Sequence, residues 1–253
     1  MSKYHDYLKD LTDINISDVL AANNLFFTYK GKIDKLYDDL ERGVAILDCE
    51  EQLMAYINLY GHQHIAKLYR AFSKLPNDIV LNSTINIIDY GCGQALGTMC
   101  YAEFRKSKNP KQHVNSVTLI EPSVPCLERA EFHTRLFFPQ ASINLVNKVF
   151  DDLTPNDIYC DHNIPTLHVF SNVLDMKTFD IIKMTDLIDK CVKGYNYFVC
   201  VSPYHLFSNM SRNVKYLVNK LQGTIVFRES TIALRYNSNK YCASDIICFN
   251  VHK

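Results

Sequence analysis

Two hydrophobic periodicities divide the chain into two regions. Between Glu50 and Leu75, apolar residues recur at steps of three and four positions, which predicts an amphipathic helix that ends at Pro76. The whole of residues 1–82 has helical spacing and few strand signals. After this stretch, short β-rich runs alternate with helical stretches, which is typical of a mostly parallel sheet with crossover helices. We therefore predict an N-terminal helical extension, residues 1–82, followed by an α/β domain, residues 83–253.

Seven strands are expected in the second region. Five of them alternate with helices, at residues 85–89, 117–121, 143–147, 166–170 and 197–201. The helices are expected near residues 95–108, 124–138, 177–193 and 209–221. The last two strands, from residue 224 towards 234 and at 246–251, have no long helix between them, which indicates an antiparallel edge hairpin. The predicted fold is a Rossmann-like, doubly wound, mostly parallel seven-stranded α/β sheet with an antiparallel edge hairpin.

The first predicted strand ends in an acid and a glycine-rich turn that opens a helix. The turn reads Asp89-Tyr90-Gly91-Cys92-Gly93. Glycines let the backbone approach a ligand with no Cβ in the way, and a helix start offers free N–H groups. A dinucleotide-binding turn needs no acid before its first glycine, so Asp89 suits a ligand with a cationic amine or sulfonium better than a diphosphate. The alternative is a sharp strand-to-helix turn with no ligand.

Acidic residues also follow the next two predicted strands. Glu121 ends the second strand, and Asp151 and Asp152 follow the third. Open α/β sheets bind ligands at the carboxyl ends of their strands. A carboxylate at Glu121 can accept both hydroxyls of a ribose, and one at Asp151 or Asp152 can accept an adenine amino group while the ring packs on Phe150. The alternative for each acid alone is a solvated strand end or a helix cap.

Composition limits the classes of protein that remain. The chain has 253 residues, and its 27 Lys+Arg equal its 27 Asp+Glu, so no strong attraction to nucleic acid is visible. Its nine cysteines never form C-x-x-C, so we expect reduced core residues and no metal site. No stretch approaches the ~20 apolar residues of a membrane span, and the charged start is unlike a signal peptide. We expect a cytoplasmic protein that does not enter a membrane; its oligomeric state is not readable from the chain.

Three segments carry a resemblance to a known family: DYGCGQALG at 89–97, VTLIEPS at 117–123 and NKVFDDL at 147–153. Together they resemble the class I S-adenosylmethionine-dependent methyltransferases, over roughly residues 80–253. The third glycine of the usual D-x-G-x-G-x-G pattern is replaced by Ala95. The resemblance implies that the turn wraps the methionine part of S-adenosylmethionine, the second-strand acid holds the ribose and the third-strand acid holds the adenine. The expected cofactor-binding residues are Asp89, Gly91, Cys92, Gly93, Glu121, Pro122, Phe150, Asp151, Asp152 and Ser171.

Residues after the fourth and fifth predicted strands are candidates for the reaction. Methyl transfer is an in-line displacement, so the protein mainly positions the nucleophile and, where needed, removes its proton. The catalytic candidates are Asn172, Tyr204 and His205, with His205 a conceivable base. Ser171 and Asn172 are candidates to bind substrate or the methionine end of the cofactor, or else simply cap the next helix. The sequence here is not the N/D-P-P-Y pattern of amino-directed nucleic-acid methyltransferases.

The predicted helix of the extension contains a polar row. Tyr60, His64 and Lys67 stand at i, i+4 and i+7, beside the apolar stripe, and are candidates to face the cofactor cleft. The alternative is an ordinary amphipathic edge. The sequence thus predicts an S-adenosylmethionine-dependent methyltransferase with RNA as the first candidate substrate. The alternatives are a small-molecule or protein substrate, or a non-catalytic module that binds the cofactor or a partner.

Overall fold

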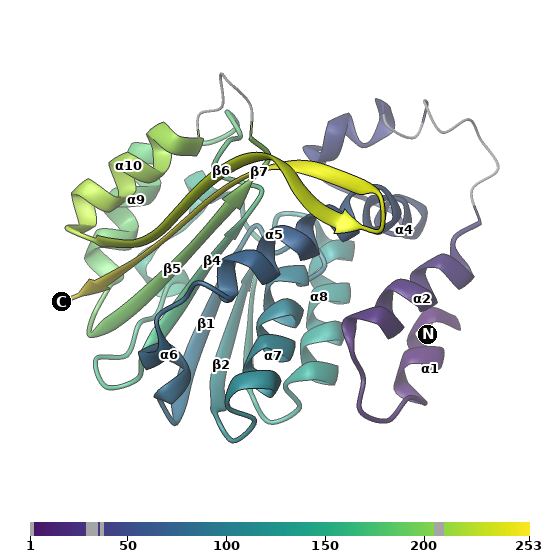
Figure 1. Cartoon of the computed structure of the whole chain (residues 1–253), viewed down its shortest axis with the longest axis horizontal. Helices are drawn as coiled ribbons and strands as arrows, with labels where there is room; N and C mark the ends of the chain where they lie inside the picture. Colours follow the sequence, from purple (N-terminus) through teal and green to yellow (C-terminus); the bar gives the residue numbers. More distant parts are fainter. Residues whose placement is uncertain (1–2, 29–34, 36–37, 205–209) are drawn as a thin grey trace.

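The computed structural model describes residues 3–28, 35, 38–204 and 210–253. Among these residues, one seven-stranded sheet forms the centre, in the order β3-β2-β1-β4-β5-β7-β6 (Figure 1). Its strands are β1 (Thr84–Tyr90), β2 (His113–Ile120), β3 (Ser142–Val146), β4 (Thr166–Ser171), β5 (Tyr195–Ser202), β6 (Thr224–Asn237) and β7 (Lys240–His252). The first five strands are parallel, and β7 is antiparallel to both β5 and β6. The predicted α/β sheet with its antiparallel edge hairpin is confirmed.

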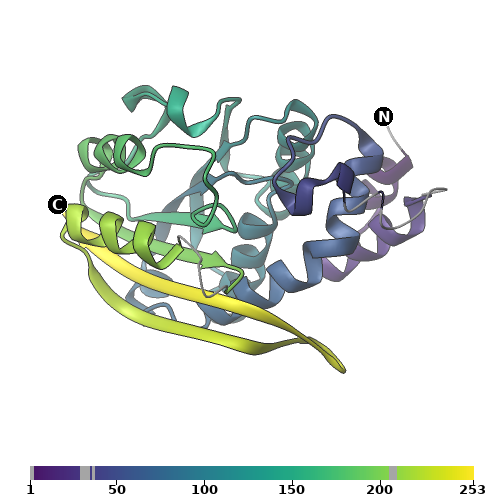
Figure 2. The same ribbon diagram turned by 90° about the horizontal axis from the view of Figure 1, so that it is seen from above.

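Alternating apolar residues in the strands fill two cores, one on each face of the sheet. In β1, Ile85 and Ile87 belong to one core, and Ile88 and Tyr90 belong to the other. The first core is covered by helices α5 (His62–Phe72), α7 (Leu96–Lys108) and α8 (Val124–Phe137). The second is covered by α9 (Ile181–Cys191) and α10 (Met210–Leu221) (Figures 1 and 2). Strands buried on both faces explain the nearly continuous apolar runs in the sequence.

The N-terminal region is helical where the structure describes it. It contains α1 (Lys3–Lys9), α2 (Ile16–Phe26), the 3-10 turn η1 (Glu41–Gly43), α4 (Glu50–Tyr56), the π-helical turn η2 (Ile57–Gly61), α5 and α6 (Asn77–Leu81). The helix predicted from residue 50 to 75 is thus α4, η2 and α5 in succession. Residues of α5 share one core with the strands, since Leu68 and Phe72 pack in the same cluster as Val199 and Cys248. The boundary at residue 82 stays a prediction.

The cysteines behave largely as core residues. All nine are free thiols, and eight of them are buried, with Cys49 the exposed exception. In the part of the chain that the structure describes, no helix combines the length and the apolar character that crossing a bilayer requires.

Candidate functional site

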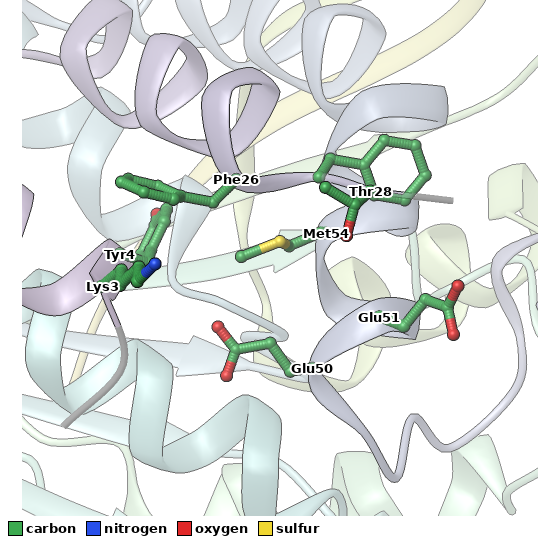
Figure 3. A pocket seen from close by; sticks show the side chains of 8 residues that line it. Lys3, Tyr4, Phe26, Thr28, Glu50, Glu51 and Met54 are labelled. Atoms are coloured by element: carbon green, nitrogen blue, oxygen red, sulfur yellow. The ribbon is translucent and has the colours of Figure 1, made fainter. Parts of the chain in front are cut away.

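A pocket of about 590 Å³ opens at the carboxyl ends of β1, β2 and β4. The α/β region contributes Gly91, Gly93, Glu121 and Asn172 to its lining. The N-terminal region contributes the opposite wall, from the segment at residues 39–47 and from Gln52 and Tyr56. A second cavity, of about 390 Å³, lies between α1, the end of α2 and the start of α4 (Figure 3). It contains no residue that the sequence singled out, so the first pocket is the candidate site.

The two glycines of the turn differ in the space around them: Gly91 is crowded by a neighbouring side chain, whereas Gly93 is open. Gly91 and Gly93 both have a positive φ, of +61° and +52°. A Cβ at Gly91 would lie 2.7 Å from Cγ1 of Val173, whereas a Cβ at Gly93 would meet nothing within 4 Å. Gly91 is therefore required by the backbone conformation and by packing against the β4 side of the cleft. Gly93 instead borders empty space, which is what close approach of a ligand to the backbone needs.

Asp89 does not face the pocket, contrary to the prediction. It is fully buried, and its Oδ2 accepts hydrogen bonds from the Thr98 backbone N–H at 3.1 Å and from the Thr98 hydroxyl at 2.9 Å. Its Oδ1 is buried and has no hydrogen-bond partner among the residues that the structure describes. Burial raises the pKa of this carboxyl to about 6, against the lowering effect of the two Thr98 hydrogen bonds. The acid thus ties β1 to the first turn of α7 and holds the glycine turn in shape.

Glu121 does line the pocket, at the end of β2. Its Oε2 accepts the Gly93 N–H at 3.0 Å, and its Oε1 accepts the Ser123 N–H at 2.9 Å. Its pKa is raised by burial, although both backbone hydrogen bonds lower it. Each carboxylate oxygen keeps further acceptor capacity for a ligand. Pro122 also lines the pocket, whereas Cys92 is not among the lining residues, and its thiol donates to the Gly93 carbonyl at 3.6 Å within the turn.

The two acids after β3, Asp151 and Asp152, are not among the lining residues of the pocket. Asp151 lies in the 3-10 turn η3 (Phe150–Asp152), and its Oδ1 accepts the Asp180 backbone N–H at 3.0 Å. The Asp151 carbonyl also accepts a hydrogen bond from the Lys183 ammonium, and Asp152 is exposed to solvent. Phe150 does line the pocket, edge-to-face with Phe179 at 4.9 Å between ring centroids. This corner is therefore an apolar surface for a flat ring rather than an acidic one.

Apolar and polar side chains complete this corner. Val149 and Met176 lie beside the two phenylalanines in the lining, together with Thr178 and Lys148. The Lys148 ammonium pairs with both carboxylate oxygens of Asp157, at 2.9 and 2.7 Å.

At the end of β4, the pocket wall is backed by a buried lysine. Lys67, from α5, is 1% exposed, and its ammonium donates to Oδ1 of Asn172 at 2.5 Å. Asn172 in turn donates from Nδ2 to the Ser171 hydroxyl oxygen at 3.0 Å, and both residues line the pocket. Asn172 has a φ of +61°, fixed by its backbone N–H donating to the Val201 carbonyl at 2.7 Å. Burial lowers the pKa of Lys67 to about 8, against the raising effects of Cys242 and Asp175.

The rest of the predicted polar row forms an aromatic stack. The rings of Tyr60 and His64 lie 6.1 Å apart between centroids, and those of Tyr56 and His64 lie 5.7 Å apart. Tyr56 reaches the pocket, whereas Tyr60 and His64 are behind the lining. The His64 pKa is held well below its usual value, mainly by burial and further by Lys67, so the ring is neutral. Tyr204 is half-buried outside the lining, and His205 lies outside the described residues.

Several pocket residues had no signal in the sequence analysis. Gln94 of the turn lines the pocket, and its Nε2 donates to the Leu53 carbonyl of α4 at 2.9 Å. Its Oε1 lies 3.4 Å from a guanidinium nitrogen of Arg129, which is also paired with Glu50 at 2.6 Å. The glycine turn is thus bonded to the N-terminal region through one side chain. A polar residue inside the turn was the available signal for Gln94, but nothing local predicts its partners.

The comparisons with known proteins bear on the fold. No family model matches the sequence, and no curated protein matches it either. A chain from a complex of the methyltransferase activator Trm112 with a proposed methyltransferase of Haloferax volcanii has a TM-score of 0.51 and 11% identity, covering 89% of this chain and 100% of that one. The N-methyltransferase NodS of Bradyrhizobium japonicum has a TM-score of 0.47 and 16% identity, covering 78% and 99%. The chain has the fold of class I S-adenosylmethionine-dependent methyltransferases, as the sequence predicted.

Proposed function

We propose that the protein binds S-adenosylmethionine in the pocket at the ends of β1, β2 and β4 and transfers its methyl group to a small-molecule acceptor. The observation that carries the proposal is the buried Glu121 carboxylate, which faces this pocket beside the open space at Gly93. A buried acceptor pair next to an exposed stretch of backbone suits a ligand with neighbouring hydroxyls. The fold of the chain supports this assignment.

The lining residues fit the parts of this cofactor unequally. Glu121 would accept the ribose hydroxyls, and Phe150 with Val149 would cover the adenine ring. Gly91 and Gly93 would let the methionine part approach the turn. Asp89 and Asp151 have no direct part in this assignment, because neither lines the pocket and each accepts a hydrogen bond from another residue of the protein.

Bound S-adenosylmethionine supplies a methyl group on a sulfonium, which is an electrophile that needs no metal. The protein's task is then to align an acceptor and to exclude water. Tyr56 and the segment at residues 39–47 close the pocket on the side opposite the sheet. Asn172 and Ser171 border the same space from β4 and are the proposed acceptor-side residues, in place of Tyr204.

A small molecule fits the charges of the pocket better than RNA. The N-terminal wall carries the carboxylates of Asp39 and Glu41. Among the described lining residues Lys148 is the single cation, and Asp157 already neutralises it. Binding of nucleic acid depends on Lys and Arg near the phosphates, and an acidic rim opposes it.

Calorimetric titration with S-adenosylmethionine and S-adenosylhomocysteine tests the proposal. We expect both ligands to bind. If neither of them binds, the cofactor assignment is rejected. Transfer of radiolabelled methyl groups into small-molecule, protein and RNA fractions then tests the reaction. Label in the small-molecule fraction supports the proposal, label in RNA alone would reassign the substrate, and label in none would leave a cofactor-binding module.

The Glu121→Ala variant tests the residue that carries the proposal. Loss of charge-assisted hydrogen bonds to the ribose should weaken S-adenosylhomocysteine by roughly 1.5 to 3 kcal/mol. The control is Glu128→Ala, which removes an exposed carboxylate from α8 and should leave the affinity unchanged. Melting temperatures of both variants separate loss of the ligand contact from loss of the fold.

A further inference from the structure

The hydrogen bonds at the end of β4 have a fixed direction. A lysine ammonium has donors and no acceptor, so the oxygen of the Asn172 amide must face Lys67. The Asn172 Nδ2 group must then face the other way, towards Ser171 and the pocket. The orientation of this amide is therefore set by a buried charge.

The same direction of hydrogen-bond donation continues from Asn172 to the surface of the pocket. One Nδ2 hydrogen of Asn172 is used by the Ser171 hydroxyl oxygen, and the second hydrogen remains for the pocket. Because the Ser171 oxygen accepts this bond, its own hydrogen is also available. We call Lys67, Asn172 and Ser171 the donor array. Its pocket end presents hydrogens, and the ammonium behind it strengthens them as donors in a site of low dielectric.

No described residue gives Lys67 a direct counter-ion. Among the described residues, the single hydrogen bond of its ammonium is the one to Asn172, and no carboxylate forms an ion pair with it. Asp175 contributes through its field, but its Oδ1 accepts the Ser202 hydroxyl at 2.8 Å. An unpaired buried ammonium is costly, and an apolar side chain would fill the same space without that cost. A negative ligand group on the pocket side of Asn172 would supply the missing charge.

We propose that the methyl acceptor is an acid, and that the donor array binds its anionic oxygen, with Asn172 and Ser171 in contact and Lys67 positioning Asn172. The proposal rests on the function proposed above and narrows its substrate class. A carboxylate is acceptor-only and matches an array of donors, whereas an ammonium is donor-only and opposes it. Glu121, at the other end of the pocket, has the opposite polarity and does not compete for this group.

The test compares probes of matched shape and opposite polarity. Benzoate, benzamide and benzylamine are titrated into the protein, free and saturated with S-adenosylhomocysteine, and binding is followed by calorimetry. We expect benzoate to bind at least about tenfold more tightly than benzylamine, with benzamide between them. Equal affinities, or no binding of benzoate, would overturn the proposal. Because S-adenosylhomocysteine is titrated separately, failure of the cofactor assignment would be seen independently.

Asn172→Asp reverses the polarity at a nearly constant shape. It replaces the pocket-facing amide nitrogen by an acceptor and gives Lys67 a carboxylate partner, so the preference for benzoate over benzylamine should be lost. Lys67→Met removes the charge that orients the amide and should reduce the same preference. The control is Asn156→Asp, which adds the same charge at an exposed position outside the pocket. An unchanged preference in Asn172→Asp would exclude the array as the binding group.

A second comparison separates the acceptor from the cofactor, which has its own carboxylate. S-adenosylmethionine and its decarboxylated analogue are titrated into wild-type protein and Asn172→Asp. We expect the variant to change the affinities of both by the same factor. If only S-adenosylmethionine is weakened, by about tenfold or more, the array binds the carboxylate of the cofactor and the assignment to the acceptor is wrong.

Discussion

At one end of the pocket, after β2, the Glu121 carboxylate accepts hydrogen bonds from the backbone. At the other end, after β4, the Lys67 side chain donates to Asn172, and the Asn172 side chain donates to Ser171. Glu121 and Gly93 lie 28 positions apart, on either side of one βα unit, and are brought together by the parallel pairing of β1 and β2. Lys67 and Asn172 lie 105 positions apart and meet because α5 packs against β5, β6 and β7. The acceptor end therefore follows from a local motif, and the donor end depends on tertiary packing.

Substitution of each of the two glycines tests the pocket end that contains Glu121 in a different way: one variant should lose stability, and the other should lose affinity for the cofactor. Gly91→Ala combines a positive φ with a Cβ 2.7 Å from Val173, so we expect a loss of roughly 2 to 5 kcal/mol in unfolding free energy. Gly93→Ala adds a Cβ in open space and should cost only about 1 to 2 kcal/mol. Urea denaturation measures both. Cofactor titration should still show a clear loss of affinity in Gly93→Ala, because its methyl group occupies the ligand side.

If the two variants were equally stable, the packing of Val173 against the turn would not be what requires Gly91.

Lys67→Met tests the charge at the donor end. The Lys67 pKa is about 8 in the fold and near its usual 10.5 when unfolded, so the native state binds fewer protons between these pH values. Stability from this group therefore rises with pH across that window, by about 3 kcal/mol in total. Subtracting the curve of Lys67→Met, measured in reductant between pH 7 and 10.5, isolates this rise from the titration of cysteines and tyrosines. Parallel curves would mean that the ammonium is not buried as described.

Asp89→Asn tests whether the acid of the turn is structural. Its pKa of about 6 lies above the usual 3.8, so the native state binds more protons and the stability from this group is lost as pH rises from about 4 to 6. The variant cannot ionise at this position, so it should not lose this stability. At pH 7 its unfolding free energy should be higher than that of the wild type by roughly 2 to 3 kcal/mol. Its affinity for S-adenosylhomocysteine should stay close to wild type. A large loss of affinity with a preserved fold would instead restore Asp89 as a ligand contact.

The sequence predicted elements and local motifs better than side-chain directions. Strand and helix positions followed from periodicity, because burial on both faces of the sheet repeats along each element. The acids at strand ends were found, but a strand-end position leaves the side chain free to turn inwards. The Asp89 carboxylate accepts hydrogen bonds from Thr98, and the Asp151 carboxylate accepts one from Asp180. Of these three acids, Glu121 is the one that lines the pocket.

The far wall of the pocket was not predictable for a related reason. The segment at residues 39–47 carries no motif, and the position of Tyr56 depends on where the N-terminal helices dock. The polar row was visible as a periodicity, but which member reaches the sheet depends on the π-helical turn between α4 and α5. Lys67, the last of the row, is the member that contacts the pocket wall.

The π-helical turn Ile57–Gly61 gives this helix one residue that it can lose. Such a turn accommodates one residue more than an α-helical turn, so deletion of one residue there would restore regular winding and keep Tyr56 and Lys67 on their present faces. Deletion of one residue from α5 between His62 and Lys67 would instead rotate Lys67 by about 100° relative to α4 and move it away from Asn172. Loss of one residue should therefore be tolerated far better in η2 than in the α-helical turns that follow it.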